Sequence, residues 1–470
     1  MFESAMRGSK AVRIAIVGGG LTGALLCMRL LRSSHGPFSI ALYEKQPQRF
    51  CRGVAYSSSL PYQLLNVPAG KMSLFLEAPD DFVHWLEVRG GRHKPEDFVP
   101  RRLFGDYLCE RFAQTLAAAT PHEFIRIDSE VVDLVPVDEG LRIEAANAQA
   151  RMVDRVYLCT GNFPPGELPG MDLSVRESGR YIASPWDGSY LRHVGKEDTV
   201  LVVGTGLSMI DQVMSLQERP DFAGQVIAMS RRGLLPLPHG SLEPYRLSTS
   251  LPSSPTARGL AQWLQNEIHR AEQSGSCFRA VIEALRPQIP ILWSALPLRE
   301  RKRFMRHLRP FWEIHRHRIP QPTAERLQHL IAADKLRVLA GRISGLTLTT
   351  PDTLRIDYVS RGQTQPQQLS VNWVINCTGP QTDQRQLPSP LYHALCARAL
   401  VQRDASGLGV LTTLQGEAIR SDGEVERRLV LVGPPAKATL WESTALQEIR
   451  HQVHLLVNGL EQEFTTENVA

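Results

Sequence analysis

Two glycine-rich turns are the part of this sequence whose residue types and spacing indicate a specific chemistry. The first is Gly18-x-Gly20-x-x-Gly23, and the second begins Gly204-x-Gly206. Each turn follows a short apolar run and precedes a helix-like stretch. In such a strand-turn-helix, backbone N–H groups and the helix dipole are placed to bind a pyrophosphate. Two turns in one chain predict two dinucleotides, a combination typical of proteins that pass electrons between them.

The first turn has all three glycines of the pattern. They permit a tight turn, a close approach to a pyrophosphate and close packing of helix on strand, in that order. Glu44 ends the next apolar run and follows Gly23 by 21 residues, near the spacing at which a carboxylate meets an adenosine ribose. The alternative is a tight turn without a ligand. The predicted first site contains Gly18, Gly20, Leu21, Thr22, Gly23, Glu44 and Lys45.

The second turn departs from the pattern, because Met209 occupies the third glycine position. This weakens the close-packing argument and leaves the pyrophosphate argument intact. Two arginines follow the next strand, where an NAD-selective fold would have an acid, and they can pair with a 2′-phosphate. NADPH is therefore favoured over NADH, the alternative being arginines that cap the sheet edge in solvent. The predicted second site contains Gly204, Gly206, Ser208, Ser230, Arg231 and Arg232.

A Cys-Thr-Gly sequence occurs twice, each time at the end of a β-like run. The two copies are Cys159-Thr160-Gly161 and Cys377-Thr378-Gly379. A small residue and a glycine allow the backbone to turn sharply beside a bound nucleotide. Each cysteine taken alone is more simply a small buried strand residue. We add Thr160, Gly161, Thr378 and Gly379 to the two predicted sites.

The composition is that of a soluble globular protein with two or three domains. The chain has 470 residues, of which 43% are hydrophobic and 21% charged, with a net charge of +5. No apolar run is long enough for a membrane span, and the start lacks a secretory signal. Seven scattered cysteines without C-x-x-C predict reduced thiols in the cytoplasm and argue against a disulfide reductase. No motif of a serine nucleophile, zinc site or phosphate loop is present, so we predict no metal and assign no catalytic side chain.

The order of the apolar runs predicts an α/β fold with two Rossmann-like dinucleotide-binding domains. We expect the first domain in residues 1–190 and again in 381–470, and the second in 191–380. Amphipathic patterning over about 255–332 predicts an all-helical insertion in the second domain. The Pro- and Gly-rich stretch Phe163 to Gly170 is interpreted as a domain crossing.

The predicted insertion contains a strongly basic stretch. Between Arg299 and Arg318, eight Lys and Arg residues stand against two Glu, a net charge of +6. Three interpretations remain open: a solvated helix face, an anion site for cofactor phosphates or an acidic substrate, and nucleic-acid binding. No recognition motif supports the last. His315 and His317 are two apart, so on a helix they point to different faces and are poor candidates for a metal pair.

The motifs together resemble a known family of flavoproteins. The chain is similar to flavoproteins with two dinucleotide-binding domains, which include the class B flavin monooxygenases and the ornithine and lysine N-hydroxylases. It most resembles bacterial FAD/NAD(P)-binding oxidoreductases. Besides the two turns and the Thr160-Gly161 corner, the resemblance rests on Gly53-Val54-Ala55-Tyr56, Leu65-Asn66-Val67-Pro68, Met72-Ser73, Pro185-Trp186, Ser230-Arg231-Arg232-Gly233 and Trp441-Glu442-Ser443-Thr444-Ala445.

This resemblance implies FAD on the first domain and NAD(P)H on the second. The loop Leu65–Ser73 would lie by the flavin, and a last helix, from about Trp441 to Val457, would aim backbone N–H groups at the ring. Many relatives have Gly-Asp at the end of the final strand where this chain has Gly433-Pro434. The ribityl chain would therefore find its polar contact elsewhere. The residues added to the FAD site are Asn66, Val67, Met72, Gly433, Trp441 and Thr444.

The implied activity is that of an FAD-dependent NAD(P)H oxidoreductase. Hydride would pass from NADPH to flavin and then to oxygen and a small-molecule substrate, with hydroxylation placed ahead of simple dehydrogenation. Class B monooxygenases have a histidine where this chain has Ala183, although Ser208-x-x-Asp211 is similar to theirs. The alternatives are a flavin reductase or oxidase without hydroxylation, and a flavin-bound sensor or scaffold whose basic helices bind a partner. His239 would either reach the nicotinamide or serve as a hydrogen-bonded loop histidine.

Overall fold

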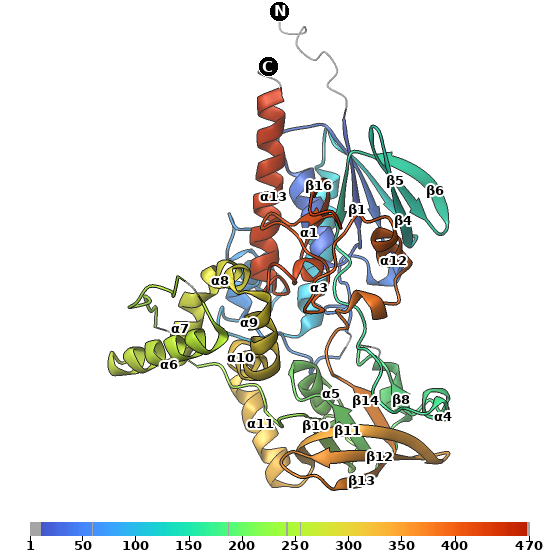
Figure 1. Cartoon of the computed structure of the whole chain (residues 1–470), viewed down its shortest axis with the longest axis vertical. Coiled ribbons are helices and arrows are strands. Elements are labelled where there is room, and N and C mark those ends of the chain that lie inside the picture. Colours follow the sequence, from blue (N-terminus) through green and yellow to red (C-terminus); the bar gives the residue numbers. More distant parts are fainter. Residues whose placement is uncertain (1–10, 59, 187, 241–242, 254, 468–470) are drawn as a thin grey trace, which may run out of the picture. The chain divides into compact units, whose positions relative to one another are not determined.

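The chain folds into two compact units in a computed structural model (Figure 1). Residues 11–467 are described, except 59, 187, 241, 242 and 254. Unit 1 is formed by Met1–Ser57, Pro68–Phe163 and Thr382–Ala470, and unit 2 by Ser58–Val67 and Pro164–Gln381. Each is a mixed α/β unit around a sheet with parallel strands.

The unit boundaries differ from the predicted domain limits at two places. The first crossing lies at Phe163 and Pro164, inside the stretch Phe163 to Gly170 that was interpreted as a crossing, and not at residue 190, because strand β8 (Tyr181–Ile182) pairs with strand β14 (Trp373–Asn376) of unit 2. The segment Ser58–Val67 also belongs to unit 2, although the chain on both sides of it is in unit 1. The second crossing, after Gln381, lies one residue from the predicted limit.

Unit 1 contains a sheet of six described strands. Its order is β15-β16-β7-β1-β2-β3, and all neighbours are parallel except the pair β15 and β16. The strands are β1 (Val12–Val17), β2 (Phe38–Tyr43), β3 (Glu123–Ile127), β7 (Arg155–Leu158), β15 (Glu417–Ile419) and β16 (Val425–Leu431). An antiparallel sheet of β4 (Val131–Val137), β5 (Gly140–Ala145) and β6 (Ala148–Val153) is connected between β3 and β7.

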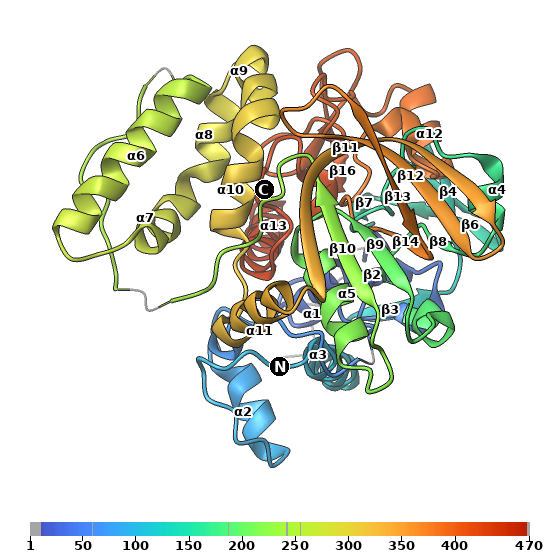
Figure 2. The ribbon, with the colours of Figure 1, turned by 90° about the horizontal axis from the view of Figure 1, so that it is seen from below.

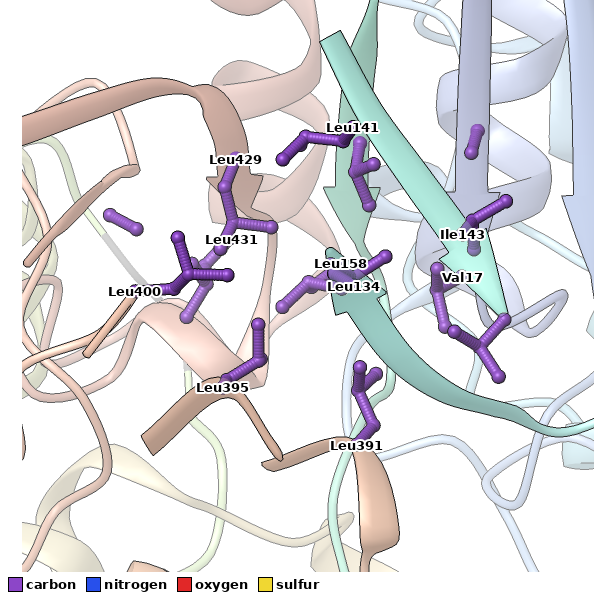
Figure 3. Close-up of a cluster of buried hydrophobic side chains, with 14 of the residues drawn as sticks. Val17, Leu134, Leu141, Ile143, Leu158, Leu391, Leu395, Leu400, Leu429 and Leu431 are labelled. Atoms are coloured by element: carbon purple, nitrogen blue, oxygen red, sulfur yellow. The ribbon is translucent and has the colours of Figure 1, made fainter. Parts of the chain in front are cut away.

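Alternate residues of β1 face opposite sides of this sheet, as the period of a strand requires. Val17 and its counterparts on β7 and β16 pack on β4, β5 and α12 (Pro390–Ala397), which form the cluster shown in Figure 3. Ile16 faces the other side, toward α1 (Leu21–Leu31). Helix α1 packs in turn on α3 (Arg101–Ala117) and α13 (Leu446–Glu467). The remaining helices of unit 1 are α2 (Asp81–Val88) and the short 3-10 turns Pro47–Arg49, Ala69–Lys71, Gln384–Gln386 and Pro434–Ala436.

Helix α13 starts later and ends later than predicted. It begins at Leu446, because the chain before it forms turns in which Ser443 N–H donates to Leu440 O and Thr444 N–H donates to Glu442 O. It continues past Val457 because the buried apolar stripe Ile449, Val453, Val457 runs on to Leu460.

Unit 2 repeats the plan of unit 1 with its own strands. Its sheet of seven described strands has the order β13-β12-β11-β10-β9-β14-β8, with parallel pairing from β11 to β8 (Figure 2). The strands not yet given are β9 (Thr199–Val203), β10 (Gln225–Ser230), β11 (Leu336–Thr350), β12 (Thr353–Ser360) and β13 (Pro366–Val371). Residues 341–350 of β11 pair antiparallel with β12, and β12 pairs antiparallel with β13. Helix α5 (Leu207–Gln217) follows β9 as α1 follows β1.

Residues 257–332, between β10 and β11, are predominantly helical. They form α6 (Ala257–Gln273), α7 (Phe278–Leu285), α8 (Ile289–Ala295), α9 (Leu298–Arg303), α10 (Arg309–Arg316) and α11 (Gln321–Ala332). A 3-10 turn (Arg286–Gln288) joins α7 to α8, and a π-helical turn (Phe304–Leu308) joins α9 to α10. Helix α11 packs on the sheet core through Leu327 and Leu330. Unit 2 also contains α4 (Leu173–Glu177) and a 3-10 segment, Gly188–His193. None of the described helices combines the length and the hydropathy needed to cross a membrane.

The cluster of Figure 3 gives a test of unit 1. Leu134 is fully buried there, so Leu134→Ala should reduce the free energy of unfolding by about 2–5 kcal/mol through lost transfer energy and a cavity. Leu455, which is 56% exposed on α13, provides the matched control, and Leu455→Ala should have a much smaller effect. Urea unfolding followed by fluorescence measures both, and equal shifts for the two variants would contradict this packing.

Candidate functional site

The first glycine turn is fixed by the strand beside it. Gly18 has φ +101°, and a Cβ at this position would lie 2.4 Å from the Cys159 carbonyl oxygen. Gly18 N–H donates to Tyr43 O, and Cys159 N–H donates to Val17 O, both at 2.8 Å. A Cβ on Gly23 would lie 1.9 Å from Gly18 O, so close packing of α1 on β1 requires glycine at both positions.

The second turn is built in the same way from different residues. Gly204 has φ +115°, and its Cβ would lie 2.2 Å from the Cys377 carbonyl oxygen. Gly204 N–H donates to Met229 O at 2.7 Å, and Cys377 N–H donates to Val203 O at 2.8 Å. In both units, therefore, the Cys-Thr-Gly corner of one strand abuts the glycine turn of its neighbour.

The second glycines of the two turns have different surroundings. A Cβ on Gly20 would lie 3.1 Å from the Cα of Gly53, so a neighbouring loop covers this glycine. Gly206 is exposed, has a φ of −89°, and would place a Cβ where no atom lies within 4 Å. The packing of the described residues therefore gives no reason for glycine at 206. The absence of a side chain there leaves the start of α5 accessible to a ligand.

Met209, at the third glycine position of the second turn, is accommodated in the core. Its side chain is fully buried and belongs to the cluster that joins α5 to Val202 on β9 and Ile375 on β14. Helix α5 thus packs on the sheet of unit 2 through the Met209 side chain. In unit 1, Gly23 at the same position lets the backbone of α1 pack directly on the first turn.

Glu44 supports the first turn directly. It is 9% exposed, and its two carboxylate oxygens accept hydrogen bonds from Gly19 N–H and Gln46 N–H, each at 2.8 Å. The sequence predicted contact with a ribose, and the structure shows that Glu44 also orders the first glycine turn. Lys45 forms an ion pair with Glu130 at 3.0 Å.

The Ser230-Arg231-Arg232 segment contains two arginines with unequal surroundings. Ser230 Oγ accepts from Gly233 N–H at 3.0 Å and lies 2.9 Å from the Thr205 hydroxyl, which ties β10 to the second turn. The Arg232 guanidinium lies 4.9 Å from the centre of the Phe311 ring. Arg231 is exposed, and no described residue forms a hydrogen bond or ion pair with its side chain. Arg231 is thus the guanidinium that remains available to a phosphate.

Several arginines of the basic stretch form ion pairs or hydrogen bonds inside the helical segment, residues 257–332. Arg303 pairs with Glu300 at 2.7 Å, and Arg309 pairs with Glu313 at 2.6 Å. Arg301 donates from Nε and Nη2 to two backbone carbonyls, both at 3.0 Å. Glu300 also accepts from Ala257 N–H at 2.9 Å and so connects α9 to the start of α6.

Arg318 stands out within this stretch because it is only 3% exposed. Its Nη2 lies 2.6 Å from Glu283, whereas Nε and Nη1 have no hydrogen-bond partner in the described part of the chain. Burial lowers the pKa of Arg318; Glu283 opposes that shift, and the nearby Arg316 and Arg279 add to it. A buried guanidinium with unsatisfied donors favours an anion.

The loop that contains His239 lies against these arginines. Arg279 Nε donates to Pro238 O at 3.1 Å, and His239 N–H donates to Ile319 O at 2.8 Å. His239 Nε2 lies 2.9 Å from Asn66 O. His239 is therefore a hydrogen-bonded loop histidine, and it holds the Ser58–Val67 segment, with the predicted residues Asn66 and Val67, in unit 2.

Asn376 is a residue of the second corner that the sequence analysis did not select. It is fully buried; its Oδ1 accepts from the N–H and the hydroxyl of Thr378, and its Nδ2 donates to Gly166 O and Tyr181 OH. A buried amide with four partners fixes the turn into Thr378-Gly379. The available signal was a polar residue interrupting an apolar strand.

Of the remaining predicted residues of unit 1, Thr160 and Gly433 follow the ends of β7 and β16, whereas Met72, Trp441 and Thr444 lie in turns. A Cβ on Gly433, at φ +74°, would lie 3.0 Å from the Thr22 hydroxyl. Thr160 Oγ1 lies 3.1 Å from Tyr392 OH. Met72 is buried, and Trp441 is buried with the Lys437 ammonium 4.9 Å from its ring centre. Trp441 and Thr444 lie in the turns before α13 and not in its first turn, which corrects the predicted helix start.

Unit 1 contains most of the segment that matches a known protein family. Residues 15–163 match a family model described as FAD-NAD(P)-binding. A search of curated protein sequences gave no match.

Solved structures with low sequence identity share the fold over almost the whole chain. An ornithine N-hydroxylase from Kutzneria sp. 744 is 17% identical, with a TM-score of 0.66 over 97% of this chain and 100% of its own. The L-lysine 6-monooxygenase of Pseudomonas syringae is 16% identical, with a TM-score of 0.66 over 96% and 99%. The bacillithiol disulfide reductase of Staphylococcus aureus is 12% identical, with a TM-score of 0.56 over 97% and 99%.

The family match confirms the predicted resemblance to FAD- and NAD(P)-binding proteins, and the solved structures show that the chain shares its fold with enzymes of the predicted kind. The match over residues 15–163 covers the first glycine turn, Glu44 and the first Cys-Thr-Gly corner. Residues 15–163 are therefore similar to the FAD-NAD(P)-binding family, and the chain shares the fold of the ornithine N-hydroxylase and the L-lysine 6-monooxygenase.

Proposed function

We propose that this protein is an FAD-dependent NADPH oxidoreductase that hydroxylates a small molecule. The observation that supports it most is the duplicated turn, with Gly18 on Cys159 O and Gly204 on Cys377 O. In this proposal, unit 1 is a Rossmann-like FAD domain, and unit 2 is a Rossmann-like NADPH domain with residues 257–332 as its helical insertion. The family match and a neighbour solved with reduced FAD and NADP⁺ support these cofactors.

The residues of unit 1 fit FAD. The turn Gly18–Gly23 and the start of α1 present backbone N–H groups to a pyrophosphate, and Glu44 holds this turn in shape. Bound FAD would supply the redox chemistry by accepting hydride from NADPH. The side chains around it position the cofactor and exclude water.

The residues of unit 2 fit NADPH. Open space over Gly206 admits the pyrophosphate to the start of α5, and Arg231 can pair with the 2′-phosphate through charge-assisted hydrogen bonds. Arg232 has a supporting role, because its contact with the Phe311 ring connects the turn after β10 to the helical segment.

Anaerobic mixing with NADPH tests this proposal directly. The FAD-loaded protein should lose its visible flavin absorbance on mixing with NADPH, and faster than with NADH. After air is admitted, a hydroxylated product should form when the correct substrate is present. Hydrogen peroxide as the sole product with every substrate offered would favour a reductase or oxidase. A protein that does not take up FAD would contradict the proposal.

Gly206→Ala separates ligand binding from folding. The added methyl group has free space in the protein, so the free energy of unfolding should change by no more than about 0.5 kcal/mol. It would obstruct the pyrophosphate, and the KM for NADPH should rise about tenfold or more, as for a lost hydrogen bond to a charged group.

Gly459→Ala is the control for this variant, because a Cβ at Gly459 would also have no atom within 4 Å. It should leave the KM for NADPH unchanged. An unchanged KM in Gly206→Ala as well would remove the second turn from the cofactor site.

The two arginines provide a test of cofactor choice. Arg231→Ala should raise the KM for NADPH by about tenfold or more and leave that for NADH unchanged, because only NADPH has the 2′-phosphate. Arg326→Ala removes another exposed arginine, on α11, and should change neither value. Steady-state kinetics with both nucleotides measure the effect; equal losses for NADPH and NADH in Arg231→Ala would contradict the assignment.

The surroundings of Arg318 support an acidic group on the substrate. Arg318→Met keeps an unbranched, apolar stem but removes the guanidinium and its charge, so the KM for amines that have a carboxylate should rise about tenfold or more. Matched amines without the carboxylate should be unaffected, which distinguishes this effect from general misfolding. Product formation across both substrate sets is the measurement, and a parallel loss for both sets would argue against the acidic group.

A further inference from the structure

The loop that covers the first glycine turn packs along one face of α3. Phe50 meets Phe112 with ring centres 5.2 Å apart, and Tyr56 meets Phe104 at 4.7 Å. Between these ring contacts, Arg52 forms an ion pair with Asp106 at 2.6 Å. These contacts fix residues 50–56 against the helix inside unit 1.

Two cysteines meet in the middle of this contact. Cys51 lies between Phe50 and Arg52 in this loop, and Cys109 lies on α3 between Gly105 and Phe112, which both contact the loop, so the two thiols face the same contact although they are far apart in the sequence. Cys51 is 2% exposed and has φ +63°, an uncommon conformation for a residue with a side chain, whereas Cys109 on α3 is half-buried. All seven cysteines, each of them described, are free thiols.

The two thiols differ in acidity. The hydrogen bond from Cys51 lowers the pKa of Cys109 to about 7; Arg52 adds to this, while burial and Asp106 oppose it. The hydrogen bond with Cys109 and burial raise the pKa of Cys51, and Arg126 on β3 opposes that rise. A half-buried thiolate beside a buried thiol has the arrangement of an attacking cysteine and a resolving cysteine.

We propose that Cys51 and Cys109 form an intramolecular disulfide when the protein meets hydrogen peroxide. The Cys109 thiolate attacks one peroxide oxygen, the O–O bond breaks, and a sulfenic acid forms with release of hydroxide. The Cys51 sulfur then attacks the Cys109 sulfur and expels the sulfenic oxygen, which leaves as water after taking up the thiol proton. In total, two thiols lose two electrons and two protons, and one peroxide becomes two water molecules.

The position of this pair makes it a modification site of the first nucleotide turn. Cys51 N–H donates to Gly19 O at 2.7 Å, and the backbone of Gly53 lies against Gly20. The pair is therefore one hydrogen bond away from the turn proposed to bind the pyrophosphate.

The test is peptide mapping of the reduced full-length protein after treatment with an equimolar amount of hydrogen peroxide. Alkylation and mass spectrometry without reductant should give a peptide that joins residues 51 and 109, lighter by two hydrogens and lost on reduction. The reaction should be faster above than below a pH of about 7, because the thiolate fraction of Cys109 increases through that range. A wild-type digest without this peptide, with both thiols alkylated as in the untreated protein, would overturn the proposal.

Variants separate the roles of the two cysteines. Cys109→Ser should abolish the reaction at Cys51, whereas Cys51→Ser should leave a sulfenic acid at Cys109 that dimedone traps. Cys396→Ser removes another half-buried thiol, on α12, and should still give the 51–109 peptide. Equal peroxide consumption by Cys109→Ser and wild type would contradict the assignment. The wild-type digest decides the question even where a serine variant does not fold.

Discussion

The contact of a backbone carbonyl with the first glycine of each turn is the constraint on which the two units depend. Cys159 O lies so close to Gly18 that a Cβ there would clash with it, and Cys377 O lies similarly close to Gly204. The contact sets where the first strand ends and where the following helix begins, so that backbone N–H groups point away from the sheet. The same contact recurs in both units, and it supports the proposal that the backbone binds a pyrophosphate at each turn.

The units differ in what surrounds this shared construction. In unit 1, Gly53 covers Gly20 and Glu44 accepts from Gly19 N–H, so the turn is a closed, ordered structure. In unit 2, no described atom lies within 4 Å of a Cβ on Gly206, and Arg231, the first residue after β10, is exposed. A tightly held cofactor suits the first arrangement, and a nucleotide that enters and leaves suits the second.

Local patterns in the sequence predicted the strands that precede and follow the two glycine turns, the turns themselves and the basic helical segment, but not the short or exposed strands β5, β8, β13 and β15. The glycines at 18, 23 and 204 are required by backbone contacts between neighbouring elements, so their spacing carries structural information. Contacts between residues far apart in the chain leave no comparable spacing in the sequence. Asn66 joins unit 2 through a hydrogen bond to His239, and Cys51 meets Cys109 because a loop packs on a distant helix. The absence of C-x-x-C excluded an adjacent cysteine pair and gave no information about this one.

The start of α13 and the role of Glu44 are two features that the sequence motifs did not predict in full. A Trp-Glu-Ser-Thr-Ala motif indicated a helix opening, but the turns at Ser443 and Thr444 delay the helix to Leu446. Glu44 has the spacing of a ribose ligand, and the structure adds two backbone hydrogen bonds that the spacing did not indicate. In both cases the hydrogen bonds of a few backbone groups decide what the residue does.

The most direct test of two separate dinucleotide sites is the binding of NADP⁺ to the FAD-loaded protein by equilibrium dialysis, with both ligands quantified. The duplicated turn predicts one FAD per chain, one additional NADP⁺ per chain, and no release of FAD as NADP⁺ saturates. Displacement of FAD by NADP⁺, or failure of NADP⁺ to bind while FAD is present, would contradict the account.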